Sequence, residues 1–313
     1  MKEDVEDKIT VSAPGKIILS GEHAVVYGKP AILAAINRRL FVSVRQSSKN
    51  EIITSESPKL AEFARDFVLK TFGKPREKLR IEISSEISIG CGMGSSAALA
   101  VATTAGLFKY LNKPFDKEKI NEIAYEIEKK QHGNPSGGDN TISTYGGFLW
   151  FRKETEFLKL FKQLQFDLTK FVLINTGRPK ETTGEMVLGV RKLYDKNRLK
   201  TEKILNEIEK TTKQLLVAFN QMDEKLIRIT IRENERLLEK LEVISNFAKK
   251  IIRGIEKLGG AAKICGAGGK KKGSGIILAF HPQKDVLFEL AKKKNLPAFE
   301  VKLGEEGVRI EKS

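Results

Sequence analysis

The feature that most constrains this chain is a glycine-rich segment that runs straight into a run of small apolar residues. Residues 89–96 read Ile-Gly-Cys-Gly-Met-Gly-Ser-Ser, and residues 97–102 continue as Ala-Ala-Leu-Ala-Val-Ala. This order predicts a tight loop that ends at the start of a helix, with serine at the helix mouth. Unpaired backbone N–H groups and the helix dipole make such a mouth an anion site, and phosphate is its natural ligand. A serine hydroxyl there can also coordinate Mg²⁺.

The spacing of the glycines limits what this segment can be related to. It is neither GxGxxG nor GxxxxGK followed by Ser or Thr, so it supports neither a dinucleotide-binding fingerprint nor a Walker-type loop. A glycine-rich helix start can also be a simple turn, and the segment alone does not decide between the two interpretations.

Short apolar runs separated by proline and glycine predict strands in the first half. The runs cover residues 9–13, 17–19, 31–36 and 40–44, and the turns are expected at Pro14-Gly15, Gly21 and Gly28. A helix is predicted over about 59–72 and a half-buried strand over 79–83. A further helix follows Asp116, and Glu128 lies at the edge of its apolar face. A carboxylate that binds nothing would be costly there.

The second half is predicted to open with a new buried strand at 171–174. We therefore expect one domain over residues 1–168 and a second over residues 169–313. Amphipathic helices are predicted over 185–194, 201–219 and 224–258, followed by a second glycine-rich loop at 265–275. The predicted order then closes with a strand (276–280), a helix (284–293) and a strand (298–303).

The chain is basic, with 56 Lys and Arg against 40 Asp and Glu and a net charge of +16. Its basic residues are interleaved with glutamate in helical segments rather than massed with aromatics, so we expect a solvated lysine-rich surface and no nucleic-acid partner. Two cysteines cannot form a disulfide framework, which favours a reducing, cytoplasmic location. We expect no signal peptide, no membrane span and no membrane partner, because long uninterrupted apolar runs are lacking.

Two carboxylates could share the work of phosphoryl transfer. Glu128 stands at a predicted helix end, and Asp139 follows eleven residues later across a Pro/Gly-rich loop. One carboxylate could help to hold Mg²⁺, and the other could accept the proton of an attacking hydroxyl. The alternative for Asp139 is an Asx-type turn without chemistry.

A lysine and a histidine near the N-terminus have similar double interpretations. Lys16 lies between Gly15 and the apolar run 17–19, so it either snorkels to solvent or pairs with a carboxylate. His23, which follows Glu22, would more often be a hydrogen-bonding turn residue than a catalyst when taken alone.

Three segments taken together resemble the GHMP kinase family. The segments are residues 13–28 (Ala-Pro-Gly-Lys to Tyr-Gly), 90–98 (Gly-Cys-Gly-Met-Gly-Ser-Ser-Ala-Ala) and 266–269 (Gly-Ala-Gly-Gly), and they span nearly the whole chain. The resemblance implies a two-domain α+β fold, with an N-terminal ribosomal-protein-like domain, a C-terminal ferredoxin-like domain and the active site between them. Residues 22–28 and 132–139 are most similar to the family members that phosphorylate the C5 hydroxyl of mevalonate.

The resemblance also implies roles for individual residues. Asp139 and Lys16 would be catalytic, and Glu22, His23 and Thr182 would contact mevalonate. Ser95, Ser96 and Glu128 would hold Mg²⁺. The ATP phosphates would lie on Gly90, Gly92, Met93, Gly94, Ser95, Ser96 and Ala97. ATP and mevalonate would be the small-molecule partners, and a homodimer is left open.

Two departures from the family pattern bear on the substrate. Ser88 stands where the second motif usually begins with proline, and Lys270 to Lys272 interrupt the third glycine run. The three lysines could hold a substrate carboxylate or phosphate, or they could form a solvated bulge. They leave phosphomevalonate open as an alternative substrate.

A basic RNA- or nucleotide-binding protein of the same fold is the non-enzyme hypothesis. Such a protein would not need Lys16, Glu128 and Asp139 together.

Cys91 and Cys265 both fall in glycine-rich loops. We interpret them as small apolar residues rather than a redox switch, because they lack CxxC spacing.

Overall fold

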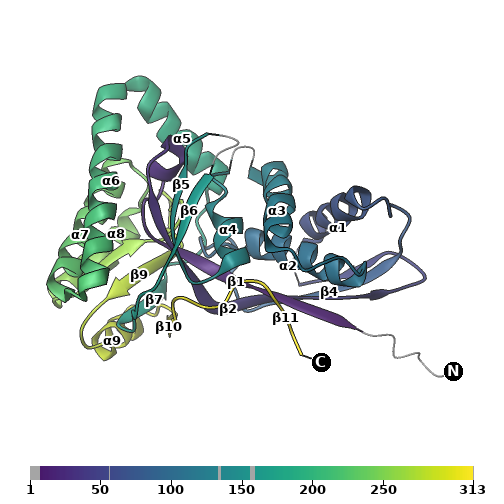
Figure 1. Ribbon diagram of the computed structural model, residues 1–313. Helices are drawn as coiled ribbons and strands as arrows, with labels where there is room; N and C mark the ends of the chain where they lie inside the picture. Colours follow the sequence, from purple (N-terminus) through teal and green to yellow (C-terminus); the bar gives the residue numbers. More distant parts are fainter. Residues whose placement is uncertain (1–7, 56, 133–134, 156–158, 313) are drawn as a thin grey trace.

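The computed structural model describes residues 8–55, 57–132, 135–155 and 159–312. It contains two β-sheets, one of seven strands and one of four, with helices packed against both. This is the mixed α+β architecture expected from the sequence (Figure 1). Within the described residues, the helices are all too short or too polar to cross a membrane.

The larger sheet is built around two long antiparallel strands, β1 (Ile9–Ser20) and β2 (Ala31–Gln46). Its main path runs β11-β1-β2-β4-β3, and β5 and β6 extend from the other part of β2. The remaining strands are β3 (Glu51–Ile53), β4 (Leu79–Ser85), β5 (Phe148–Lys153), β6 (Lys159–Leu164) and β11 (Arg309–Ile310).

Four helices accompany this sheet: α1 (Lys59–Thr71), α2 (Ser95–Tyr110), α3 (Lys117–His132) and α4 (Gly138–Tyr145). Helix α2 packs on β1 and β2, and α1, α3 and α4 in turn pack against α2. Its small residues let it be buried from Ala97 to Phe108 with few exceptions, which allows close approach from several sides. The start of α2 is therefore held rigidly inside the molecule.

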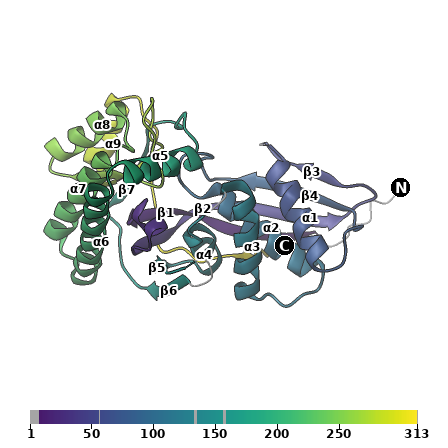
Figure 2. The same ribbon diagram turned by 90° about the horizontal axis from the view of Figure 1, so that it is seen from above.

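The smaller sheet has the order β10-β7-β9-β8 and is antiparallel throughout. Its strands are β7 (Phe171–Asn175), β8 (Ala261–Ile264), β9 (Ile276–Phe280) and β10 (Ala298–Glu300). The helices are α5 (Thr183–Lys196), α6 (Arg198–Gln221), α7 (Glu224–Lys240), α8 (Asn246–Lys257) and α9 (Asp285–Lys293). Figure 2 shows α5 to α9 at one end of the molecule and α1 to α3 at the other, with β1 and β2 running between them.

The two ends share core and backbone. Phe171, Phe219 and Phe280 belong to the same buried apolar cluster as residues of β1 and β2. Strand β11 returns to pair with β1, and the Arg39 guanidinium donates to the carbonyl oxygens of Glu306 and Gly307, both at 2.8 Å. The division of the chain at residue 168 stays a prediction.

The structure corrects several element boundaries. The runs 9–13 and 17–19 form one strand, because the expected turn at Pro14-Gly15 is a bulge inside β1. The runs 31–36 and 40–44 likewise merge into β2, and the strand expected at 298–303 covers only Ala298–Glu300.

The helix predicted over 224–258 is two helices. Helix α7 ends at Lys240, Glu242 takes a left-handed φ of 59°, and the Ser245 hydroxyl caps α8 by accepting from Ala248 N–H. In the gap between the helices, the Val243 carbonyl accepts a hydrogen bond from Gly269 N–H at 2.9 Å. The break therefore gives the second glycine-rich loop its backbone partner.

The loop before α2 also contacts this second loop, and Gly92 lies at one of the points of close contact. Gly92 has a φ of +87°, and a Cβ atom placed on it would lie 2.6 Å from the Cys265 carbonyl oxygen. We expect Gly92→Ala to lower the free energy of unfolding by roughly 3 kcal/mol, through backbone strain plus overpacking.

Gly73→Ala is the matched control for that variant in urea denaturation. Gly73 also has a positive φ, of +67°, but no atom lies within 4 Å of the added methyl group. Its cost should be only about 1 kcal/mol, from the left-handed backbone alone. Equal losses of stability for the two variants would contradict the packing argument.

Candidate active site

Lys16 is buried in the bulged part of β1, and its side chain is 3% exposed. Its backbone N–H donates to the Met93 carbonyl oxygen at 2.9 Å, and its aliphatic stem lies against Gly94, where an added Cβ would come within 2.7 Å of Lys16 Cγ. The ammonium Nζ pairs with Asp139 Oδ2 at 3.1 Å. Of the two alternatives for Lys16, the structure therefore has the carboxylate pair.

Asp139 comes from the first turn of α4, which begins after Gly137 in a left-handed conformation. The turn before the helix is closed by the Ser136 hydroxyl, which accepts from Gly138 N–H at 3.2 Å. The Ser143 hydroxyl ties α4 to β1 by donating to the Pro14 carbonyl oxygen at 3.0 Å. The Asp139 side chain is 35% exposed, so it can be reached by a substrate while it stays on Lys16.

Glu128 lies deep beside this pair, at 3% exposure near the end of α3. The Ser96 hydroxyl, in the first turn of α2, donates to Glu128 Oε1 at 3.3 Å. Burial and the charge of Asp139 together raise the pKa of Glu128 to about 8, against the opposing effects of Lys16 and of the Ser96 hydrogen bond. The structure thus gathers Lys16, Ser96, Glu128 and Asp139 from four different elements.

The start of α2 offers the anion site expected from the sequence. Gly94 precedes the helix in a left-handed conformation, and Ser95, Ser96 and Ala97 form its first turn. Their backbone N–H groups are among those that an α-helix leaves without an intrahelical partner. These groups and the positive end of the helix dipole make the site suitable for phosphate.

A cavity of about 500 Å³ opens beside this helix start and includes Ser95 and Ser96 in its wall. Its cations are Lys59, Lys130 and Arg178. Apolar side chains make up much of the rest, namely Leu40, Leu60, Ala61, Phe63, Ile83, Ile89 and Leu99. An apolar pocket that ends at cations and a helix N-terminus suits a flat base carrying phosphates.

Arg178 reaches the glycine-rich loop from the segment that follows β7. Its Nε lies so close to Gly90 that a Cβ there would come within 2.6 Å. The cavity is therefore bordered by a cation from the second half of the chain.

Glu22 and His23 lie at the end of β1 but face the second glycine-rich loop. Glu22 is fully buried and forms an ion pair with Lys263 of β8. His23, which has a positive φ of 60°, has its Nε2 3.1 Å from the Ala267 carbonyl oxygen. Burial lowers the pKa of His23 to about 4, so its imidazole is neutral near pH 7.

Thr182 is exposed and forms a capping box at the start of α5. Its hydroxyl accepts from Glu185 N–H at 3.2 Å, and Glu185 Oε2 accepts from Thr182 N–H at 2.7 Å. Lys270, Lys271 and Lys272 are exposed as well, and Lys270 pairs with Glu242 at 3.3 Å. Of the quoted stretch 132–139, Gly133 and Asn134 lie outside the described residues.

Both cysteines are free and buried where the two glycine-rich loops meet. The Cys91 carbonyl oxygen accepts from Ile276 N–H at 3.1 Å. Burial raises the pKa of both thiols, that of Cys265 to about 12. Neither is a reactive thiolate near neutral pH.

The sequence interpretation did not single out Lys263 or Arg178 as site residues. Lys263 interrupts the apolar run 261–265, which is the same signal that drew attention to Lys16. Arg178 lies four residues before Thr182 in a segment considered only for the threonine, and no local pattern marks it.

Comparison with known proteins identifies the class. Residues 59–147 match the model of the GHMP kinases N terminal domain. The chain is 38% identical to the mevalonate kinase of Archaeoglobus fulgidus over 96% of this chain and 99% of that one. It is 32% identical to the mevalonate kinase of Pyrococcus furiosus over 97% and 98% of the two chains.

A solved structure has the same fold along the whole chain. The structure of L. major mevalonate kinase in complex with R-mevalonate superimposes with a TM-score of 0.81 at 22% identity, covering 98% of this chain and 99% of that one.

These relationships show that the chain belongs to the GHMP kinases, which are small-molecule phosphotransferases dependent on ATP. Its relatives of 38% and 32% identity over nearly the full length place it in the mevalonate kinase family within that class. The chain is thus an enzyme, as the sequence interpretation expected.

The raised pKa of Glu128 affects how the stability of the metal-free protein depends on pH. A carboxyl whose pKa is about 8 in the folded state and 4.5 when unfolded is protonated only in the folded state between these values. The stability of the parent should therefore fall as the pH rises from about 4.5 to about 8. In Glu128→Gln this part of the pH dependence should disappear, as judged by urea midpoints at pH 5, 7 and 9.

Glu126→Gln is the control on the same helix. Glu126 is 46% exposed and pairs with Lys129 at 2.7 Å, so its removal should leave the pH profile of the parent nearly unchanged. A Glu128→Gln profile that keeps the parent's slope would contradict a buried, protonated Glu128.

Proposed function

We propose that the protein transfers the γ-phosphoryl group of ATP to the C5 hydroxyl of mevalonate. The observation that carries this proposal is the Lys16–Asp139 pair beside Ser96 and Glu128, at the mouth of a helix that borders the cavity. Full-length similarity to mevalonate kinases supports mevalonate as the acceptor.

The nucleotide fits the cavity in one orientation. The apolar side chains of α1, β2 and β4 suit the base, while Ser95, Ser96 and the nearby cations suit the phosphates. The γ-phosphate then lies at the start of α2, on the side where Ser96 contacts Glu128. The transferred group is thereby directed toward Lys16 and Asp139.

The residues at this point fit a magnesium ion. Lys16 is one cation between two carboxylates, Glu128 and Asp139, and Ser96 adds a hydroxyl oxygen. Hard oxygen donors suit Mg²⁺, and binding of the ion would displace the proton of Glu128. In the described parts of the chain no three His, Cys, Asp or Glu side chains form a ready-made metal cluster, so phosphate oxygens and water would complete the coordination. When bound, the ion supplies charge neutralisation for the phosphates.

Asp139 is proposed as the proton acceptor. The C5 hydroxyl oxygen forms a bond to the γ-phosphorus, the bond between that phosphorus and the β–γ bridging oxygen breaks, and the hydroxyl proton moves to the Asp139 carboxylate. Lys16 holds Asp139 in place at 3.1 Å. Its charge also stabilises the alkoxide that develops and the moving phosphoryl group.

Two residues are proposed substrate contacts at the acceptor end of the site. They are His23, in the turn after β1, and Thr182, at the start of α5, whereas Glu22 is already engaged by Lys263. Phosphomevalonate is the second candidate substrate, favoured by the exposed Lys271 and Lys272. A cytoplasmic location agrees with ATP as co-substrate and with two free thiols.

The test is ATP consumption with Mg²⁺ over mevalonate, phosphomevalonate, diphosphomevalonate, homoserine and galactose, with products identified by mass. We expect turnover on mevalonate and a product heavier by one phosphoryl group. Turnover only on phosphomevalonate would assign the lysine-interrupted loop to substrate selection. ATP left unused with every acceptor, together with salt-dependent RNA binding, would favour a binding protein.

The proton-acceptor role predicts a specific kinetic pattern for Asp139→Asn. Turnover should fall by about 10²- to 10⁴-fold, as expected on losing a general base, while the KM for ATP should change little, because the cavity does not include Asp139. Asp66→Asn, a surface substitution with its partner Arg65 beside it, is the control and should match the parent. Turnover of Asp139→Asn within a few-fold of the parent would remove Asp139 from the mechanism.

A further inference from the structure

Lys263 is the largest charged side chain that the structure buries completely. It lies in β8, between Ala262 and Ile264, and points out of the smaller sheet toward the end of β1. A buried ammonium needs an acceptor for each of its three protons. The identity of those acceptors shows what Lys263 holds.

All three protons have an acceptor. Lys263 Nζ donates to the carbonyl oxygens of Ile264 at 2.7 Å and Ile18 at 3.2 Å, and to Glu22 Oε1. Two of these acceptors belong to the end of β1 and the turn after it, and the third belongs to β8 itself. Lys263 therefore connects the two sheets directly through its hydrogen bonds.

The Ile18 contact falls at a special place in β1. The pairing of β1 with β2 shifts register between Pro14 and Lys16 and again between Ile18 and Ser20. Such bulges redirect side chains and interrupt the regular ladder of hydrogen bonds. Lys16 lies between the two irregular positions, and Lys263 donates a hydrogen bond to Ile18, at the second of them.

The Glu22 contact falls at the turn that carries His23. Glu22 comes immediately before His23, whose ring contacts the Ala267 carbonyl oxygen, four residues after Lys263. The Lys263–Glu22 pair and the His23–Ala267 contact thus connect the same two segments twice. The segments are the turn after β1, with Glu22 and His23, and residues 263–267, which run from β8 into the second glycine-rich loop.

A buried ion pair is a weak way to gain stability, because desolvation of both charges offsets their attraction. The end of β1 is also anchored without it. The Ser20 hydroxyl is hydrogen-bonded to Thr212 at 2.7 Å and to Asn234 Nδ2 at 3.1 Å, on α6 and α7. Stability alone therefore does not account for Lys263.

We propose that Lys263 is a positioning residue for phosphoryl transfer, which fixes the bulged end of β1, and with it Lys16 and His23, against the second glycine-rich loop. This inference rests on the proposed function in one respect, namely that Lys16 acts on the reacting groups. Lys263 acts through Glu22 and Ile18 and touches no substrate.

The test compares the parent with Lys263→Met, Glu22→Gln and the double variant Lys263→Met/Glu22→Gln. The single lysine variant leaves a buried carboxylate unpaired and should be the least stable. The double variant removes both charges, and the Ser20 contacts remain, so we expect it to fold. All kinetics are measured at a temperature below every midpoint.

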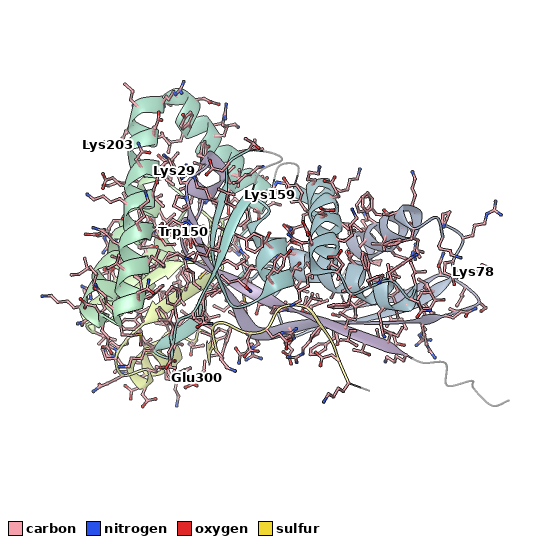
Figure 3. All side chains as sticks on the ribbon, viewed as in Figure 1. Lys29, Lys78, Trp150, Lys159, Lys203 and Glu300 are labelled. Carbon is pink, nitrogen blue, oxygen red and sulfur yellow. The ribbon has the colours of Figure 1, made fainter. Side chains whose placement is uncertain are left out.

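The matched control is Lys29→Met/Glu209→Gln. Lys29, labelled in Figure 3, follows the turn after β1 and pairs with Glu209 of α6 at 3.2 Å. This pair also joins the first part of the chain to the second, but it does not contact β8 or the second glycine-rich loop. Its removal should leave turnover within about twofold of the parent, as for an ordinary partly exposed pair.

For the double variant at Lys263 and Glu22 we expect turnover on mevalonate to fall by about 10- to 100-fold, as misplacement of a reacting group by about 1 Å can do. The KM for ATP should stay within about threefold, because none of the altered residues borders the cavity. A double variant that folds and turns over like the control would overturn the proposal. A rise in the KM for ATP as large as the fall in turnover would overturn it as well.

A second readout does not depend on the substrate. The His23 ring is titrated by NMR, with its signals assigned through His23→Gln. In the parent it should titrate with a pKa of about 4, and in the double variant the pKa should move toward 6.5 as the turn loosens. The charged groups facing this turn are Lys263 and Glu235 from β8 and α7, and Lys16 from β1.

The two readouts separate the possible failures. If the parent does not phosphorylate mevalonate, the proposed function fails, and the His23 titration alone then decides on Lys263. A shifted titration supports the positioning role, and an unchanged one overturns it.

Discussion

The candidate active site depends on a backbone-to-backbone contact between the two glycine-rich loops. Gly92, in the loop before α2, lies against the carbonyl oxygen of Cys265, in the loop after β8. No side chain larger than hydrogen fits there, so the backbones of the two loops lie in direct contact. The first loop leads to the phosphate site and the second carries the partner of His23. Glycine is therefore required at this position, because it allows the two loops of the site to approach each other closely.

Strand β1 and the turn after it each carry a charged side chain into this closely packed region. Lys16 extends to Asp139 on one side, and Glu22 meets Lys263 on the other. Each ammonium is buried, and each finds a carboxylate supplied by a distant part of the chain. Because an unpaired buried charge is very costly, the two pairs exclude arrangements in which α4 or β8 is displaced. Glu128 forms no ion pair among the described side chains, and burial together with the charge of Asp139 raises its pKa.

Local sequence patterns predicted the helices and strands well, but they predicted poorly where one element ends and the next begins. The helix start at Ser95 and the buried strand at 171–174 follow from short-range rules, whereas those rules left open whether Lys16 reaches solvent or pairs with a carboxylate. The bulge at Pro14-Gly15 looked like a turn, because the strand continues only through pairing with β2. The break between α7 and α8 is required by Gly269, a residue outside either helix. Arg178 carries no local pattern, because its position is defined by Gly90, which is far away in sequence. Lys263 has the same local signal as Lys16, a lysine inside an apolar run, and only the fold shows its partner Glu22.

The return of β11 to β1 has a consequence for synthesis of the chain on the ribosome. The edge of β1 at Val11 and Ser12 stays uncovered until residues 309 and 310 arrive, and Arg39 lacks two of its carbonyl acceptors until residues 306 and 307 do. A nascent chain that has completed α1 to α4 therefore still exposes this part of the β1 backbone. An open strand edge can pair with another chain, so the first-made sheet is vulnerable to association throughout translation of the second half.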